Sequence, residues 1–342
     1  MSCTESTEKY GVGGTLMRFL NKVITKIEAW RETNCPNREL KYGTFLYHAT
    51  IGSPTTQNAD GSFSPIDETV IPHEKLYPRF APIQRCFTHS FVDQSCSRNK
   101  SFALAWEGWK SICDRFTVWD YRTNYSAYLM FFNNYGSLQE DYIASYEAGA
   151  VNYMAEYVTG SNLSTLMDLN VYLNSRLMWN VYEDVDYLIN HFMDSYYKQG
   201  AQYMKDYLSL LRTHLAAYEL ELKEKQGELH CGMYRNDTPE YFKATTWPKK
   251  ILDKANDLLS QASASYDNIA DVDERNQMKQ RILKESVCLR YIYFNNASAY
   301  YNIYSDSFQI MANQWLTDLE TLDVSVISEN ESLSDFVSKF IK

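Results

Sequence analysis

The chain has 342 residues and a formal net charge of −10 at pH 7. It carries no block of lysines and arginines, which argues against nucleic acid or an anionic membrane surface as a partner. Its apolar stretches are far too short to span a bilayer, and its polar, acidic N-terminus lacks the apolar segment of a signal peptide. The length is enough for one large domain or two ordinary ones.

The seven cysteines are scattered along the chain. An odd count without regular spacing does not indicate a disulfide framework. We therefore expect reduced thiols, a cytoplasmic location, no metal and no cofactor. A metal site formed by Cys86, Cys96, Cys113 and His89 is a weaker alternative, because no close Cys-x-x-Cys pair anchors it.

The first part of the chain, residues 1–180, alternates strand and helix signals. A helical run follows Gly13 and Gly14 and ends near Pro36. Residues 52–67, which are rich in Ser, Thr, Pro, Asp and Gly, predict a loop. Short apolar or aromatic runs predict strands at 43–50, 80–86, 116–120 and 151–155. Helical patterns predict helices at 99–113, 138–147 and 163–179. This alternation is typical of parallel strands joined by crossover helices.

The second part, residues 181–320, predicts only helices. Apolar residues recur there at helical spacing, as in Leu252, Ala255 and Leu259. Residues 321–342 are polar and weakly patterned, which predicts a weakly structured tail. The sequence therefore predicts an α/β domain at 1–180 and a helical bundle domain at 181–320.

Two acidic residues stand at the ends of predicted strands. Asp120 and Glu156 each follow an aromatic or apolar run, about one strand–helix unit apart. Neighbouring strands of a barrel would place them on the same rim. Glycoside hydrolysis uses two carboxyl groups that flank the scissile bond, so we predict that these two form a catalytic pair. In the alternative interpretation, Asp120 is a buried acid that caps the next turn or pairs with Arg122 or Arg85.

Other side chains near the strand ends suit sugar recognition. Arg85 is placed to clamp a sugar carboxylate with two parallel hydrogen bonds, or else to neutralise Asp120. His89 is placed to bind a sugar hydroxyl, or else is a satisfied residue of the rim. Flat aromatic rings meet apolar sugar faces, although most aromatic residues pack in cores. The remaining predicted substrate-binding residues are Tyr47, His48, Trp119, Tyr121, Asn124 and Tyr125.

Four sequence strings together resemble the hallmark of one family. The strings are Arg85-Cys86-Phe87-x-His89, Asn99-x-x-Phe102, Trp119-Asp120-Tyr121-x-Thr123-Asn124 and Tyr172-Leu173-x-x-Arg176-Leu177-x-Trp179-Asn180. They resemble a glycoside-hydrolase-like family of (β/α)8 barrels, which is classed as a domain of unknown function. Its members often carry an α-glucuronidase-type N-terminal domain. The resemblance runs from about residue 10 to about residue 301.

The resemblance implies the C-terminal half of a TIM-like (β/α)8 barrel with an appended helical bundle. It implies a protein that acts on or binds oligosaccharides, with uronic-acid-bearing sugars as one substrate class. Because a closed barrel needs eight strands and four are predicted, we expect a fragment of a longer protein. We also expect an open barrel edge through which the chain self-associates. The rival hypothesis is a non-catalytic carbohydrate-binding or helical interaction module.

Overall fold

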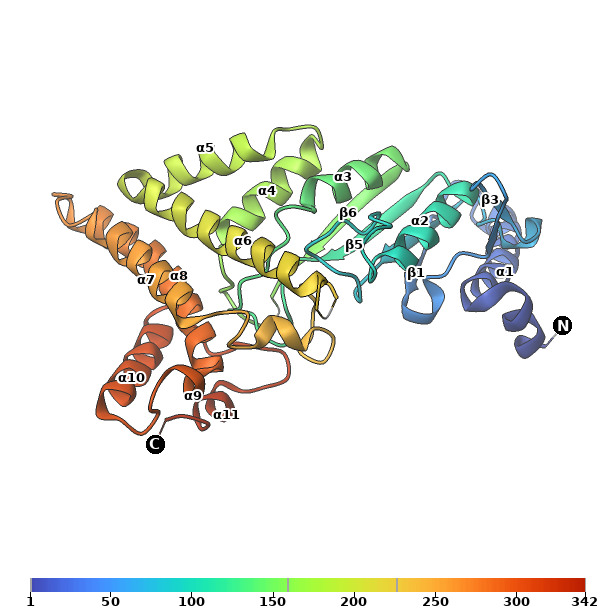
Figure 1. The fold of residues 1–342 in the computed structure, drawn as a ribbon. Helices are drawn as coiled ribbons and strands as arrows, with labels where there is room; N and C mark the ends of the chain where they lie inside the picture. Colours follow the sequence, from blue (N-terminus) through green and yellow to red (C-terminus); the bar gives the residue numbers. More distant parts are fainter. Residues whose placement is uncertain (1, 159, 226, 342) are drawn as a thin grey trace. The chain divides into compact units, whose positions relative to one another are not determined.

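The chain forms two compact units. The computed structural model describes residues 2–158, 160–225 and 227–341. The sheet unit comprises Met1–Tyr121 and Tyr135–Glu156, and the helical unit comprises Arg122–Asn134 and Tyr157–Lys342. Figure 1 shows strands only in the earlier part of the chain and helices throughout the later part. The predicted order, a mixed α/β segment followed by a mostly helical one, is confirmed.

The sheet unit contains a four-stranded parallel sheet in the order β1-β4-β5-β6. Its strands are β1 (Tyr42–Tyr47), β4 (Leu76–Ala81), β5 (Phe116–Tyr121) and β6 (Ala150–Glu156). Within the described residues, no other strand pairs with β1 or β6. The sheet therefore keeps two edges and does not close into a ring in this part of the chain.

The strand predicted at 80–86 lies earlier in the structure, as β4. Pro78 is inside β4 and pairs with Thr44 of β1, although proline removes a ladder donor and usually marks a strand end. The chain turns away after β4, where the amide of Arg85 donates to the carbonyl of Pro82 at 3.2 Å. The apolar residues that follow Pro82 therefore belong to a loop, which we call the β4–α2 loop (residues 82–99).

Two helices make the crossovers between the later strands. α2 (Lys100–Ile112) lies between β4 and β5, and α3 (Leu138–Glu147) lies between β5 and β6. A third helix, α1 (Cys3–Asn34), precedes the sheet; it has a kink at Gly11, whose φ is 68°, so the predicted run after Gly13 and Gly14 belongs to its longer second segment and an additional first segment begins at Cys3. A capping box between Ser2 and Glu5 explains this start, because it satisfies orphan amides of the first turn.

The predicted loop at 52–67 contains short elements. β2 (Thr55–Gln57) and β3 (Phe63–Pro65) form an antiparallel pair. Single 3₁₀ turns stand on either side, η1 (His48–Thr50) and η2 (Glu68–Val70). Strands of three residues are too short for a two-residue period to reveal them in the sequence.

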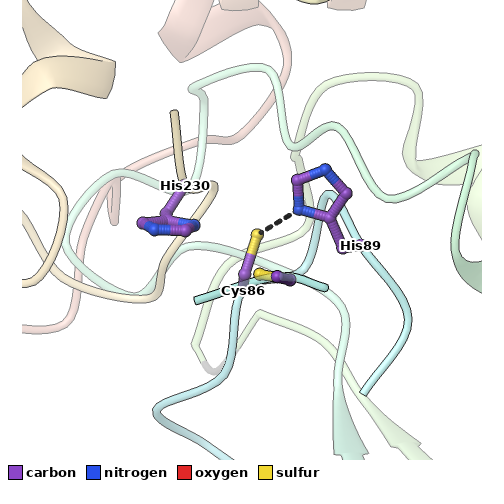
Figure 2. Close-up of side chains that lie close together, drawn as sticks. Cys86, His89 and His230 are labelled. Carbon is purple, nitrogen blue, oxygen red and sulfur yellow. Dashed lines mark hydrogen bonds between the residues drawn. The ribbon is translucent and has the colours of Figure 1, made fainter. Parts of the chain in front are cut away.

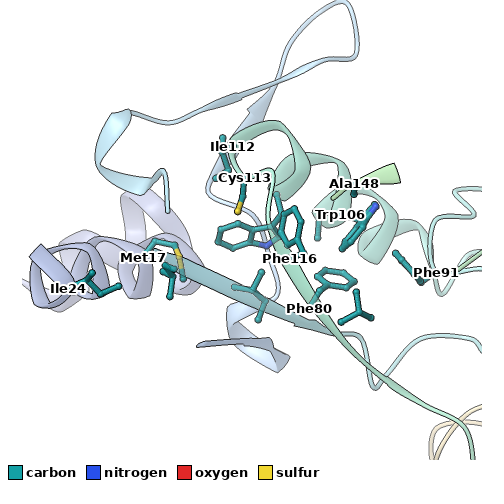
Figure 3. Packing of buried hydrophobic residues seen from close by; sticks show 14 residues of the cluster. Met17, Ile24, Phe80, Phe91, Trp106, Ile112, Cys113, Phe116 and Ala148 are labelled. Atoms are coloured by element: carbon teal, nitrogen blue, oxygen red, sulfur yellow. The ribbon is translucent and has the colours of Figure 1, made fainter. Parts of the chain in front are cut away.

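One face of the sheet packs against helices and forms the core of the unit. Leu46, Phe80 and Val118 from three strands are at most 1% exposed, and the same cluster includes residues of α1 and α2 (Figure 3). The ring of Trp106 in α2 lies 5.0 Å from that of Phe80 and 5.1 Å from that of Phe91. Edge-to-face contacts of this kind add to the gain from burying the rings.

The helical unit contains the remaining elements. They are α4 (Met167–Trp179), α5 (Val185–Tyr197), η3 (Lys198–Gly200), α6 (Ala201–Lys223), η4 (Pro239–Phe242), α7 (Lys249–Ala264), α8 (Val272–Asn295), α9 (Ala297–Tyr300), α10 (Asp306–Thr321) and α11 (Leu333–Val337). The predicted face of α7 is buried, with Leu252 and Ala255 at 0% exposure. None of the described helices is long and apolar enough to cross a membrane.

The end of the chain is more ordered than the sequence predicts. α11 lies within residues 321–342, and its Phe336 is 1% exposed. The ring of Phe340 stacks on that of Phe294 at 5.1 Å. Two aromatic side chains thus anchor a segment whose polar composition predicts weak structure.

A buried acid lies inside the helical unit. Glu285 of α8 is 4% exposed, and its carboxyl accepts a hydrogen bond from the amide of Leu166 at 3.0 Å. Burial disfavours the charged form and raises the pKa of Glu285 to about 8. The group is therefore protonated in the folded protein near neutral pH.

This acid predicts a pH dependence of stability. An unfolded glutamate ionises near pH 4.5, so the free energy of unfolding should fall as pH rises from there to about 8. Glu285→Gln keeps an acceptor for Leu166 and cannot ionise, so it should remove this loss, which is on the order of a few kcal/mol. Urea unfolding at pH 5 and pH 8 measures the effect. Glu320→Gln, at an exposed position of α10, is the control, and an unchanged pH slope in Glu285→Gln contradicts the prediction.

Candidate functional site

The register of β5 and β6 decides where the strand-end acids point. Asp120 pairs with Ala155, and Tyr121 pairs with Glu156. Consecutive side chains of a strand point to opposite faces, and paired residues share a face. Asp120 and Glu156 therefore leave the sheet on opposite faces. The structure does not bring the two predicted catalytic carboxylates together.

Asp120 points to the core face and forms an ion pair. Its Oδ1 accepts hydrogen bonds from Arg85 Nε at 3.3 Å and from the amide of Tyr121 at 2.9 Å. Its Oδ2 accepts from Arg85 Nη2 at 2.9 Å and from the hydroxyl of Tyr153 at 2.7 Å. The guanidinium thus grips the carboxylate with two bonds, which is the strong geometry for this pair.

A second carboxylate completes a buried ion cluster, defined as Arg85, Asp120 and Asp141. Arg85 Nη2 also donates to Asp141 Oδ2 at 2.6 Å, and all three residues are 0% exposed. Asp141 Oδ1 accepts from the hydroxyl of Ser90 and the amide of Phe91. Hydrogen bonds to both carboxylates offset the cost of burying two negative charges beside one positive charge.

The buried ion cluster leaves Arg85 no access to a ligand. The guanidinium is enclosed, and Nη1 also donates to the carbonyl of His89 at 3.2 Å. These contacts match the alternative interpretation, in which Arg85 neutralises Asp120. They join the β4–α2 loop, the end of β5 and α3.

Removing the cation should therefore lower stability. Arg85→Met leaves two carboxylates buried without their counter-charge, and breaking a buried pair in this way costs about 3–5 kcal/mol. We expect a large fall in the melting temperature of the full chain, measured by circular dichroism. Arg38→Met, at an exposed position, should change it little. Equal melting temperatures for the two variants would show that the cluster does not support the fold.

The opposite face of the sheet carries a different set of side chains. We call this the open face and define it by Phe45, Arg79, Trp119, Met154 and Glu156. The rings of Phe45 and Trp119 lie 5.4 Å apart. The guanidinium of Arg79 stands over both rings, at 5.1 Å and 5.4 Å from their centroids, and Trp119 Nε1 donates to Glu156 Oε2 at 2.5 Å. Phe45 is 42% exposed and Met154 is 37% exposed.

Three other predicted residues lie at strand ends beside the open face. Tyr47 shares the face of Phe45, with the two rings 6.4 Å apart. His48 follows with a left-handed φ of 47°, and its ring contacts that of Tyr47 at 4.0 Å. Tyr121 is 5% exposed, and burial, followed by the charges of Tyr47 and Glu156, raises its pKa. The structure thus places Tyr47, Tyr121 and Glu156 at the carboxyl ends of their strands, with Tyr121 interacting with both of the others.

Comparison with known proteins decides the family. A family model described as "Domain of unknown function (DUF4838)" matches residues 1–209. The chain belongs to this family. The match contains every residue of the sheet unit. No curated protein matches the chain, and no solved structure does.

Two predicted substrate-binding residues of this DUF4838 protein belong to the helical unit. Asn124 is 1% exposed, and its side-chain amide donates to the carbonyl of Gly232 at 2.6 Å. Its Oδ1 accepts from the amide of Ser126 at 3.0 Å. Tyr125 is 2% exposed, with its ring 6.2 Å from that of Tyr128. Both side chains make internal contacts of that unit.

Arg79 is the charged residue of the open face that sequence reasoning missed. A strand predicted to begin at residue 80 leaves Arg79 outside it. In the structure, Arg79 is inside β4 and its Nε donates to Thr117 Oγ1 of β5 at 3.2 Å. The signal that was available is the alternation Leu76, Pro78, Phe80, which buries every second residue and turns Arg79 to the other face.

Proposed function

We propose that the open face is a carbohydrate-binding surface of a glycoside-hydrolase-like protein. The observation that carries this proposal is the grouping of two aromatic rings, a guanidinium and a carboxylate on one sheet face. Exposed aromatic rings suit the apolar faces of sugar rings, and the carboxylate suits their hydroxyl groups. The open face therefore combines both kinds of contact that an oligosaccharide needs.

Arg79 favours sugars that carry a carboxylate, such as uronic acids. The hydroxyl oxygen of Thr117 accepts a hydrogen bond from Arg79 Nε, which keeps the Arg79 guanidinium over the rings of Phe45 and Trp119. Arginine carries five N–H donors in a planar fork that matches a carboxylate. On the open face, Arg79 thus takes the recognition role that the sequence predicts for Arg85.

The strand order supports the interpretation of a partial barrel. β1, β4, β5 and β6 are parallel and adjacent, with α2 and α3 as crossovers, as in consecutive units of a (β/α)8 barrel. In such a barrel, the face that lacks crossover helices is the inner one. The edges at β1 and β6 would then meet further strands, from a longer form of the protein or from a second copy.

Binding is the function that the geometry supports best, and hydrolysis is the second candidate. Glu156 favours hydrolysis because its carboxylate lies on the open face beside Trp119. Asp120 is held in the buried ion cluster, where Arg85 stabilises its charged form. It therefore does not face a sugar that lies on the open face, and hydrolysis would need another carboxyl group as the partner of Glu156.

Binding can be tested with acidic oligosaccharides and their carboxyl-reduced counterparts, by titration calorimetry. Trp119→Ala should weaken the binding of both ligand types. Arg79→Gln should lower the affinity for acidic ligands by about 10–100-fold, the loss expected for a charged hydrogen bond. The affinity for neutral ligands should fall far less. Arg38→Gln serves as the charge-matched control. Equal affinities for wild type, Trp119→Ala and Arg79→Gln would rule out the open face as the binding surface.

Hydrolysis can be tested with Glu156→Gln, which keeps an acceptor for Trp119 Nε1 but cannot transfer a proton as a carboxyl does. If Glu156 is the acid or base, turnover should fall by roughly 10²–10⁴-fold while the melting temperature stays close to that of the wild type. Product release from oligosaccharides, followed by chromatography, provides the measurement. Full turnover in this variant would exclude Glu156 from the chemistry, and no turnover in wild type together with retained binding would support the non-catalytic alternative.

A further inference from the structure

The β4–α2 loop brings two cysteines and a histidine together. Cys86 Sγ lies 3.3 Å from His89 Nδ1 (Figure 2), and the ligand atoms of Cys86, His89 and Cys96 are all within 4.8 Å of one another. Cys86 is 0% exposed and Cys96 is 1% exposed. His230, which Figure 2 also labels, belongs to the helical unit.

We propose that Cys86, His89 and Cys96 bind a zinc ion. Two thiolates and an imidazole are ligands that Zn²⁺ takes in proteins. In a tetrahedral site, Zn–S bonds of about 2.3 Å and Zn–N bonds of about 2.0 Å place neighbouring ligand atoms roughly 3.5–3.8 Å apart. The observed 3.3 Å between sulfur and nitrogen is close to that spacing, so small side-chain movements would admit the ion.

Asn99 fixes the backbone that carries these ligands. It is 0% exposed, and its Oδ1 accepts from the amide of Cys86 at 2.6 Å. Its Nδ2 donates to the carbonyls of Cys86, His89 and Ser90 at 2.9, 3.1 and 2.8 Å. One buried amide thus holds the turn from Cys86 to Ser90 in place before any ion arrives.

Arg85 adds a second support to the same backbone. Its Nη1 donates to the carbonyls of Cys86 and His89, at 3.4 and 3.2 Å. Groups that orient the ligands of a metal raise the affinity of the site, because less ordering is left to the binding step. The zinc proposal therefore rests on a preorganised loop as well as on the three side chains.

The charge balance suits a buried site. Binding of Zn²⁺ by two thiols releases two protons to solvent, since the ligands are thiolates. The two negative sulfurs then cancel the charge of the ion, so the site with neutral His89 carries no net charge. A neutral centre avoids the cost of an uncompensated buried charge. Three protein ligands leave the fourth tetrahedral position to a water molecule, and the ion ties Cys96, near the start of α2, to the turn from Cys86 to Ser90 in the same loop.

Cys113 is not a member of this set. The sequence groups Cys113 with Cys86, Cys96 and His89 in a candidate four-residue metal site, as the weaker alternative to no metal. In the structure, its Sγ donates to the carbonyl of Arg115 at 3.3 Å, and the group of potential ligands around Cys86 does not include it. Cys113 is buried, so it provides a control cysteine in the same unit.

The first experiment measures zinc in the full chain, purified from zinc-supplemented medium and passed over a desalting column with a weak chelator. We expect one zinc ion per chain, measured by inductively coupled plasma mass spectrometry. Cys86→Ser, Cys96→Ser and His89→Gln should each lose most of it, and Cys113→Ser should keep it. Zinc far below one per wild-type chain, or equal loss in Cys113→Ser, would overturn the assignment.

The second experiment is decided by the wild-type chain, so its outcome does not depend on whether the ligand variants fold. Cobalt added to the metal-free protein should produce thiolate-to-cobalt charge-transfer absorption that saturates at one ion per chain. Cys113→Ser should give the same intensity, and Cys86→Ser or Cys96→Ser, where it folds, should give little of this band because it loses most of the metal. Absence of this band in reduced wild-type protein would refute the site. A Cys86–Cys96 disulfide in the purified protein, with no metal uptake after reduction, would also refute it.

Discussion

The sheet unit depends on one buried guanidinium. Arg85 holds the carboxylates of Asp120 and Asp141 with the same Nη2 atom. These carboxylates come from the end of β5 and from α3, whereas Arg85 comes from the β4–α2 loop. A single cation therefore ties together three segments that are distant in the sequence. The same cation also donates to the carbonyls of Cys86 and His89, so it helps Asn99 to fix the turn that carries them.

The sheet separates two kinds of chemistry. On the core face, charges are enclosed and hydrogen-bonded, so their contribution is to the fold. On the open face, the guanidinium of Arg79 stands over partly exposed rings and Glu156 accepts a hydrogen bond from Trp119. A residue's type and its position at a strand end do not distinguish these two situations. The face to which it points does.

The sequence allowed the general architecture to be predicted, because Phe116 to Asp120 and similar runs are short, apolar and separated by helical patterns. It misplaced β4 because Pro78 resembles a strand end, and it missed β2 and β3 because each has three residues. The family resemblance marked the string from Trp119 to Asn124 without showing that Trp119 and Asp120 face opposite ways. The convergence of Cys86, His89 and Cys96 depends on Asn99, whose role is visible only in the folded loop.

The pairing of β5 with β6 contains an irregularity with a large effect. Phe116 pairs with Ala150 and Thr117 pairs with Asn152, so Val151 is an extra residue between them. Each inserted residue reverses the side-chain parity of everything beyond it. Without this extra residue, Tyr121 would pair with Ala155. Glu156 would then point to the same face of the sheet as Asp120. One unmatched valine thus decides whether the two acids of this protein meet or remain on opposite sides of a sheet.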